Sequence, residues 1–224
     1  MSRRNNAAAR CGRCRMHLSI CVCALIPTIA TRTRLLLLIH RIEERKTTNT
    51  GQLAALCLTN SEIVRRGDRT DSEPPLTLDP ASQPLLVFPH DDAKPLSTFA
   101  SLDRPITLIV PDGTWRQAFK ARKRVPQLDT VPCVTLPLGD ASTYRLRTEL
   151  HPGGLSTLEA IARAMGILEG PEVEGAILRV FRIMVDRTLW SRGVLADAEV
   201  TGGVPPGAKR HAPLSGDRLA AEEP

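Results

Sequence analysis

The chain has 224 residues, of which 42% are hydrophobic and only 3% aromatic, and its formal net charge is +6. This length and apolar content favour one α/β domain with appendages, whose core consists mainly of Leu, Val, Ile and Ala. The longest apolar run, Leu35–Ile39, is much shorter than the roughly 18 residues of a membrane span, and the polar start of the chain does not resemble a secretory signal. We therefore expect no membrane partner and a cytoplasmic location.

The start of the chain is polar and then rich in cysteine. Residues 1–10 are basic and alanine-rich, which predicts a flexible arm. Residues 11–27 form a separate loop with four cysteines: Cys11, Cys14, Cys21 and Cys23. Without a secretion signal, such a cluster is more typical of a metal site than of disulfides, and structural zinc would organise a loop with little core. The second pair is Cys-x-Cys, so an iron–sulfur cluster or a redox pair remain alternatives.

The first strand is predicted at Leu35–Ile39, and a helix is predicted at Gln52–Leu58. The intervening Thr-Asn-Thr at residues 48–50 offers three side chains that can cap a helix, although capping needs only one. A helix N-terminus beside Lys46 is also suited to bind an anion. A plain capped helix behind a solvated charged loop is the alternative.

The central element is predicted at Ile106–Val110, where apolar and β-branched residues form a buried strand that stops at Pro-Asp-Gly. A helix at 116–123 follows, so Asp112, Thr114 and Trp115 lie on a strand-to-helix loop, where open α/β sheets bind ligands. The alternative is that Asp112 and Thr114 only cap the helix and that Trp115 packs into the core.

Further strands are predicted at 61–65, 84–88 and 132–137, with a loop or short helix at 91–104. Ser156, with Glu159 three residues later, forms a capping box at the start of a helix. A second helix at about 172–190 closes the fold. From Ala198 the chain is rich in Pro, Gly and charge, which predicts a disordered tail over 198–224.

Several enzyme classes lack their motifs here. The sequence contains no Gly-rich phosphate-binding motif, no Ser-His-Asp order of a hydrolase, and no histidine and carboxylate cluster spaced for a catalytic metal. These observations argue against kinases, hydrolases and Rossmann dehydrogenases.

Five separated motifs together resemble the DTW-domain family of tRNA-uridine aminocarboxypropyltransferases. They are the cysteine cluster, Thr48-Asn-Thr-Gly51, Asp112-Gly-Thr-Trp115, Tyr144-Arg-Leu-Arg147 and Leu155–Ala160. The motifs occur in one order, and the resemblance covers roughly residues 11–190. One departure is Arg41, where the family pattern has a proline after His40.

The resemblance implies the fold of the knotted (SPOUT-like) α/β methyltransferases, a sheet with flanking helices, as a catalytic domain at residues 28–197 beside the zinc-binding loop. It also implies transfer of the 3-amino-3-carboxypropyl group of S-adenosylmethionine to N3 of a tRNA uridine, with release of methylthioadenosine. Bacterial members suggest uridine 47 of the variable loop, whereas other relatives modify uridines of the D-loop.

The implied chemistry assigns roles to particular residues. Uridine N3 is a poor nucleophile while protonated, so a nearby carboxylate would take its proton during attack. Asp112 is the candidate base, strengthened if the indole of Trp115 buries it, and Thr114 and Trp115 are the other candidate catalytic residues. Trp115 would stack on the uracil or shape the pocket. By the resemblance, S-adenosylmethionine is bound by Leu136, Pro137, Leu138, Ser142, Leu155, Ser156, Thr157 and Leu158.

Two basic segments, Arg3–Lys46 and Arg116–Arg124, flank the predicted site and indicate a polyanion near the chemistry. A solvated Lys/Arg surface is the alternative for either segment alone. The residues expected to contact RNA are Lys46, Asn49, Arg116, Lys120, Lys123, Arg124, Arg145 and Arg147.

Two other functions remain open at this point. A knotted RNA methyltransferase would use the same S-adenosylmethionine but transfer its methyl group. A non-catalytic, zinc-containing RNA-binding module is the second alternative. It is disfavoured because a pure binder has no need of an acid at the end of a strand, where the carboxylate would repel phosphate.

Overall fold

A computed structural model of the chain describes residues 6–44, 46, 49–67, 75–146 and 154–210. It forms two compact units, which are described separately: Leu25–Phe181, and Met1–Ala24 with Arg182–Pro224. The elements of the larger unit are β1 (Arg34–His40), α1 (Arg41–Glu44), α2 (Thr50–Cys57), β2 (Ser61–Arg66), β3 (Gln83–Val87), β4 (Lys94–Pro95), η4 (Leu96–Phe99), β5 (Ile106–Asp112), α3 (Trp115–Arg124), β6 (Cys133–Thr135) and α4 (Thr157–Glu169). The last helix, α5 (Pro171–Ser191), begins in the larger unit and ends in the smaller one.

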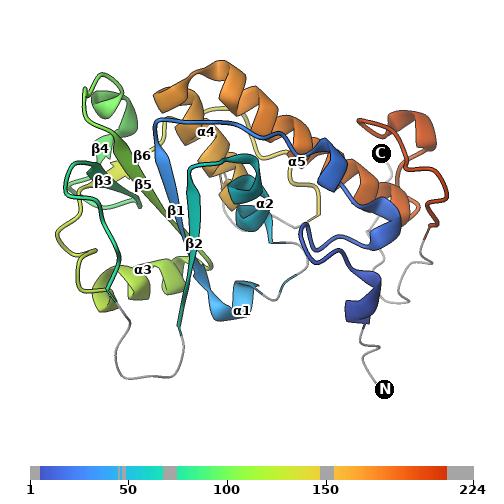
Figure 1. Cartoon of the computed structure of the whole chain (residues 1–224), viewed down its shortest axis with the longest axis horizontal. Helices are drawn as coiled ribbons and strands as arrows, with labels where there is room; N and C mark the ends of the chain where they lie inside the picture. The colour runs from blue at the N-terminus through green and yellow to red at the C-terminus, as the bar shows by residue number, and fades with distance from the viewer. Residues whose placement is uncertain (1–5, 45, 47–48, 68–74, 147–153, 211–224) are drawn as a thin grey trace, which may run out of the picture. The chain divides into compact units, whose positions relative to one another are not determined.

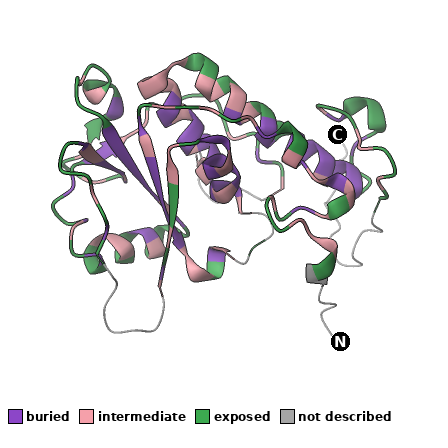
Figure 2. Ribbon diagram, viewed as in Figure 1, coloured by how far each residue is buried: buried purple, intermediate pink, exposed green. Residues whose placement is uncertain are grey.

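The larger unit is built on a six-stranded sheet in the order β2-β1-β5-β3-β6-β4, in which every pair is parallel. The central strands β1 and β5 are buried along nearly their whole length, whereas β2 at the edge is largely exposed (Figure 2). Continuous apolar runs such as Leu35–Ile39 suit strands that helices cover on both faces.

Helices cover the two faces of this sheet (Figure 1). Alternate strand residues point to opposite faces. On one face, Leu36 and Ile109 form a buried cluster with Ala118 of α3 and with residues that follow this helix. On the other face, Leu37 approaches Gly51 of α2, and α2 in turn packs against α4. Because all strands are parallel, their carboxyl ends share one edge, where the loops into α1, α2 and α3 begin.

The predicted strands and helices of this unit are all present, with ends shifted by one or two residues. The exception is the segment 91–104, predicted as a loop or short helix. It contains the 3-10 helix η4 and also the two-residue strand β4, which pairs with β6. A strand of two residues is too short to produce a period-2 pattern in the sequence. Among the described residues, no helix is both long and apolar enough to cross a bilayer.

In its described residues, the smaller unit contains 3-10 turns and the end of α5: η1 (Asn6–Ala9), η2 (Leu18–Ile20), the start of η3 (Cys23–Leu25) and η5 (Asp197–Glu199). Part of the predicted arm is thus structured, because residues 6–9 form η1 and Arg10 forms an isolated β-bridge with His17. Residues 1–5 lie outside the described part of the chain.

The predicted disordered tail does not begin at Ala198. Val200 is buried, and the buried guanidinium of Arg187 donates to the backbone carbonyls of Gly202 and Gly203. The indole N–H of Trp190 donates to Asp197 over 2.8 Å and is the main cause that lowers the pKa of this carboxyl. The composition of this segment predicted disorder because it does not show that side chains of α5 bind the segment. Residues 211–224 lie outside the described part of the chain.

Candidate active site at the carboxyl ends of the central strands

A cavity of about 200 Å³ lies where β1 and β5 end. Its walls come from the segment after β1, the loop after β5, and the connection into α4. The lining residues are Glu43, Lys46, Asn49, Thr50, Asp112, Gly113, Thr114, Tyr144, Leu155, Ser156 and Thr157. Three segments that are distant in the sequence therefore meet at the edge where a parallel sheet presents its ligand sites.

Asp112, the last residue of β5, is 7% exposed and lines this cavity. The side-chain amide of Asn49 donates to its Oδ2 over 2.5 Å, and the hydroxyl of Thr157 donates to its Oδ1 over 2.6 Å. These bonds hold the carboxylate in one orientation. An ionised carboxylate offers about four acceptor positions, so it can accept a further proton or hydrogen bond.

Asn49 and Gly51 explain the Thr-Asn-Thr-Gly motif. Asn49 caps α2, since its Oδ1 accepts from the backbone N–H of Gln52 over 2.9 Å, while its Nδ2 is bonded to Asp112. Gly51 allows α2 to approach, because a Cβ at this position would lie 2.9 Å from Asp112 Oδ2. Thr50 Oγ1 accepts from the backbone N–H of Leu158. The motif thus both caps a helix and positions the acid.

The structure separates Asp112, Thr114 and Trp115, which the sequence grouped together. Thr114 caps α3 in a capping box with Gln117 and also lines the cavity. Asp112 is not the N-cap residue of either α2 or α3. Trp115 is 61% exposed, so it does not pack into the core, and it is not among the residues that line the cavity. Asp112 is thus buried while the indole lies largely in solvent.

The connection into α4 is fastened by Glu159. Its carboxylate accepts from the Ser142 hydroxyl over 2.7 Å, the Thr143 backbone N–H over 2.7 Å and the Ser156 backbone N–H over 2.9 Å. Burial raises the pKa of Glu159, but the hydrogen bonds from Ser156, Ser142 and Thr143 outweigh it and bring the pKa below its usual 4.5. The anchored loop carries Tyr144, which is buried in the cavity wall.

The residues predicted to bind S-adenosylmethionine are only partly brought together. Leu155, Ser156 and Thr157 line the cavity, and Leu158 is fully buried in α4. The others lie outside the cavity lining, in the connection after β6: Leu136, Pro137, Leu138 and Ser142. Arg163 of α4 holds this connection, since it donates to the backbone carbonyls of Pro137 and Asp140.

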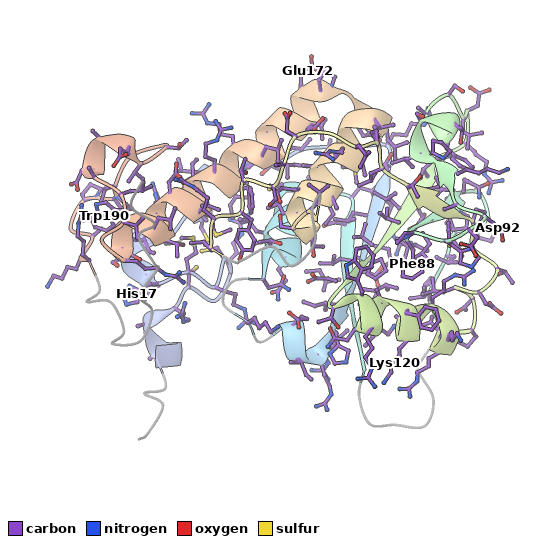
Figure 3. All side chains as sticks on the ribbon, turned by 180° about the vertical axis from the view of Figure 1, so that it is seen from behind. His17, Phe88, Asp92, Lys120, Glu172 and Trp190 are labelled. Atoms are coloured by element: carbon purple, nitrogen blue, oxygen red, sulfur yellow. The ribbon has the colours of Figure 1, made fainter. Side chains whose placement is uncertain are left out.

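The predicted RNA-binding residues fall into two groups. Four are exposed on α3: Arg116, Lys120, Lys123 and Arg124. Figure 3 shows Lys120 on the outer side of this helix. Trp115 and Phe119, also of α3, are exposed by 61% and 46%, and Lys123 Nζ lies 4.6 Å from the ring centroid of Phe119. The helix therefore combines cations with accessible rings, as single-stranded nucleic-acid binders do.

The other predicted RNA contacts lie at the cavity or beside it. Lys46 and Asn49 line it, and Asn49 is bonded to Asp112 as described. Arg145 is exposed next to the buried Tyr144. Arg147 lies outside the described residues.

Sequence reasoning missed Glu43, which is 5% exposed and lines the cavity. Its Oε1 lies 2.6 Å from Lys46 Nζ. The run Glu43-Glu44-Arg45-Lys46 is typical of a solvated loop, so no local pattern marks one of its acids as buried. Tyr144 and Thr50 were noticed only as parts of motifs.

The four N-terminal cysteines form a compact cluster in the smaller unit. Their Sγ atoms all lie within 4.8 Å of one another, with Cys11 and Cys23 at 3.5 Å and Cys14 and Cys21 at 3.6 Å. These distances far exceed a disulfide bond of about 2.05 Å. The pKa of Cys11 is lowered to about 6, chiefly by the backbone N–H of Cys14, whereas burial raises the pKa of Cys14. Four thiols so close together suit a metal ion.

Comparison with known proteins gives a family and several relatives. A family described as "DTW domain" matches residues 8–189. A "tRNA-uridine aminocarboxypropyltransferase 2" of Drosophila melanogaster is 30% identical, covering 78% of this chain and 72% of the relative. One of the same name from Macaca fascicularis is 33% identical, covering 71% and 56%.

A "tRNA-uridine aminocarboxypropyltransferase A" of Arabidopsis thaliana is 30% identical, covering 78% of this chain and 79% of the relative. The chain thus spans between about half and four fifths of the length of these three relatives. No solved structure matches it significantly.

Proposed function

Because the chain belongs to the DTW-domain family, we propose that it transfers the 3-amino-3-carboxypropyl group of S-adenosylmethionine to N3 of a uridine in tRNA. The observation that carries this proposal is the arrangement at Asp112. Motifs far apart in the sequence meet around one buried carboxylate, which Asn49 and Thr157 hold in place at the wall of a cavity. The names of the relatives supply the substrate and the group transferred.

In the proposed reaction, Asp112 accepts the proton from uridine N3 while N3 attacks the γ-carbon of the methionine chain. The new N–C bond forms as the bond from this carbon to sulfur breaks. The sulfur keeps the electron pair and leaves as methylthioadenosine. The sulfonium makes this a good leaving group, so the task of the protein is to remove the proton and to orient the reactants.

The cavity fits part of S-adenosylmethionine. Cavities that bury drug-sized ligands measure roughly 300–1,000 Å³, whereas this one measures about 200 Å³. We place the reacting end of the methionine chain in it, with the adenosine toward the connection that follows β6, where Leu136–Ser142 were predicted to bind it. We also propose that the parallel sheet belongs to the knotted class.

The released product tests this function. Purified protein, S-adenosylmethionine and unmodified tRNA should yield methylthioadenosine and, by nucleoside mass spectrometry, a uridine carrying the added group. Fragment mapping of the same tRNA would identify the modified position. A knotted methyltransferase would release S-adenosylhomocysteine instead, and a non-catalytic RNA-binding module would release neither product.

We further propose that the cysteine cluster binds structural zinc. Tetrahedral coordination with Zn–S bonds of about 2.3 Å requires sulfur–sulfur distances of about 3.8 Å, close to the 3.5 and 3.6 Å of the two pairs. Zinc would be held by thiolates of Cys11, Cys14, Cys21 and Cys23 and would stabilise the loop.

The zinc site leads to a measurable stoichiometry. Elemental analysis should find one zinc per chain, lost when Cys11 and Cys14 are both replaced by Ser. Replacing the buried Cys57 and Cys133 by Ala, as a control outside the cluster, should leave the zinc in place. Iron with visible absorbance, or protein without metal, would refute this assignment.

For the exposed face of α3 we propose binding of the tRNA backbone, supported by bases that stack on Trp115 or Phe119. Replacing Arg116 and Lys120 by Gln should weaken tRNA binding and reduce the slope of log affinity against log salt by roughly one per lost phosphate contact. The affinity for S-adenosylmethionine should not change.

A suitable control for this surface is Arg179→Gln, since Arg179 is an exposed arginine on a different helix, α5. An unchanged salt slope in the α3 variant would mean that this surface is only solvated.

A cytoplasmic location stays a prediction from the sequence.

A further inference from the structure

A second set of charges lies in the cavity, separate from Asp112. Glu43 and Lys46 both line it, and their ion pair measures 2.6 Å. The side chain of Glu43 is only 7% exposed, whereas that of Lys46 is 43% exposed. The carboxylate is therefore confined within the wall of the cavity, while the longer ammonium side chain has room to move.

The burial of Glu43 has no evident structural purpose. A buried charge is costly unless it is paired and hydrogen-bonded. Among the described residues, Lys46 is the sole side chain bonded to its carboxylate, through Oε1. Oε2 is not among the fully buried atoms that lack a partner, so it stays accessible in a side chain that is otherwise enclosed. This arrangement is typical of a carboxylate that receives a ligand.

We propose that Glu43 and Lys46 bind the two charged ends of the amino-acid group of S-adenosylmethionine. Glu43 accepts hydrogen bonds from the α-ammonium, and Lys46 donates to the α-carboxylate. In the free protein the two side chains neutralise each other, and the ligand's own pair of opposite charges replaces that contact. The inference rests on the proposed function, because it assumes that this cofactor enters the cavity.

Such binding would explain which carbon of the sulfonium reacts. The methyl group, the adenosine and the methionine chain are all attached to the same sulfur. Holding the ammonium and carboxylate at Glu43 and Lys46 fixes the far end of the methionine chain, so that its γ-carbon, rather than the methyl group, is directed to the uridine beside Asp112. Glu43 and Lys46 thus become determinants of specificity for the group that is transferred.

Methylthioadenosine provides a clean test, since it keeps the adenosine and sulfur but lacks the amino-acid group. Binding of both ligands to the full chain, without tRNA, is measured by calorimetry. Glu43→Gln should weaken the binding of S-adenosylmethionine by roughly 10–100-fold, which is the effect of losing a hydrogen bond between charged groups. Its affinity for methylthioadenosine should equal that of the unmodified protein, which also shows that the variant is folded.

The matched control is Glu44→Gln. Glu44 is the next residue of the same helix, is not part of the cavity lining, and pairs with Arg65 at 3.7 Å. The Glu44→Gln variant should bind both ligands with the affinities of the unmodified protein. Lys46→Met is tested with decarboxylated S-adenosylmethionine, which lacks the α-carboxylate. The unmodified protein should prefer the intact ligand, and Lys46→Met should bind the two alike.

Three results would overturn the inference. Glu43→Gln with an unchanged affinity for S-adenosylmethionine, or with both affinities reduced equally, would make Glu43 a part of the cavity's structure. Lys46→Met with normal discrimination but weaker tRNA binding would make Lys46 an RNA contact. If the unmodified protein binds neither ligand, the proposed function falls as well; if it binds both and one of the three results above is found, only the inference fails.

Discussion

Replacing Asp112 with Asn is expected to reduce turnover by about 10²–10⁴-fold, the usual contribution of a general base. The substitution preserves the local geometry. The amide oxygen can accept from Asn49, and the amide NH2 can donate to the Thr157 hydroxyl, which is able to accept. Binding of S-adenosylmethionine and tRNA should change little, because the proton moves only in the transition state.

The rate of a single turnover at saturating tRNA measures this effect directly. Raising the pH should restore part of the activity of Asp112→Asn, since more uridine N3 then ionises without assistance. Asp129→Asn, at an exposed position after α3, serves as the control. Nearly full activity of Asp112→Asn would exclude Asp112 as the general base. Weakened tRNA binding with a normal single-turnover rate would make Asp112 a recognition residue.

Gly51→Ala should reduce turnover by a further mechanism, the displacement of Asp112. The added Cβ would lie 2.9 Å from Oδ2 and 3.1 Å from Cγ of Asp112, and 3.2 Å from Cδ1 of Leu37. The carboxylate cannot turn aside freely, because Asn49 and Thr157 hold both of its oxygens. A misplacement of about 1 Å can cost about 10²-fold in rate, and we expect a loss approaching this size.

The matched control is Gly175→Ala, because Gly175 is also helical and a Cβ there would meet nothing within 4 Å. It should keep full activity. If Gly51→Ala acts only through the carboxylate, the double variant with Asp112→Asn should be no slower than Asp112→Asn alone. Additive losses, or full activity of Gly51→Ala, would contradict this explanation.

The sequence alone predicted most of the framework. Apolar runs such as Leu35–Ile39 and Ile106–Val110 mark strands buried on both faces, and Ser156 with Glu159 marks the start of α4. These signals are local, because periodicity and capping depend on neighbouring residues. The four cysteines were likewise expected to form one cluster, since their short spacing already confines them to one small loop.

Local patterns could not show what each residue contacts across the fold. Trp115 stands in the most distinctive motif, yet it is exposed, whereas Glu43 stands in a run that is typical of solvent and is buried in the cavity. The ordered segment after Asp197 was also missed, because its burial depends on Trp190 and Arg187 of α5.

The sequence by itself therefore determined the α/β class, the order of the elements and Asp112 as the residue at the end of the central strand. Only the tertiary structure decided how this acid is held. Asn49 and Thr157 lie 63 and 45 residues from it along the chain, and both donate to its carboxylate. Parallel pairing of β1 and β5 places Ile39 beside Asp112, so the segments that follow the two strands meet at one edge. Such a meeting depends on strand order and register, which no short stretch of sequence encodes.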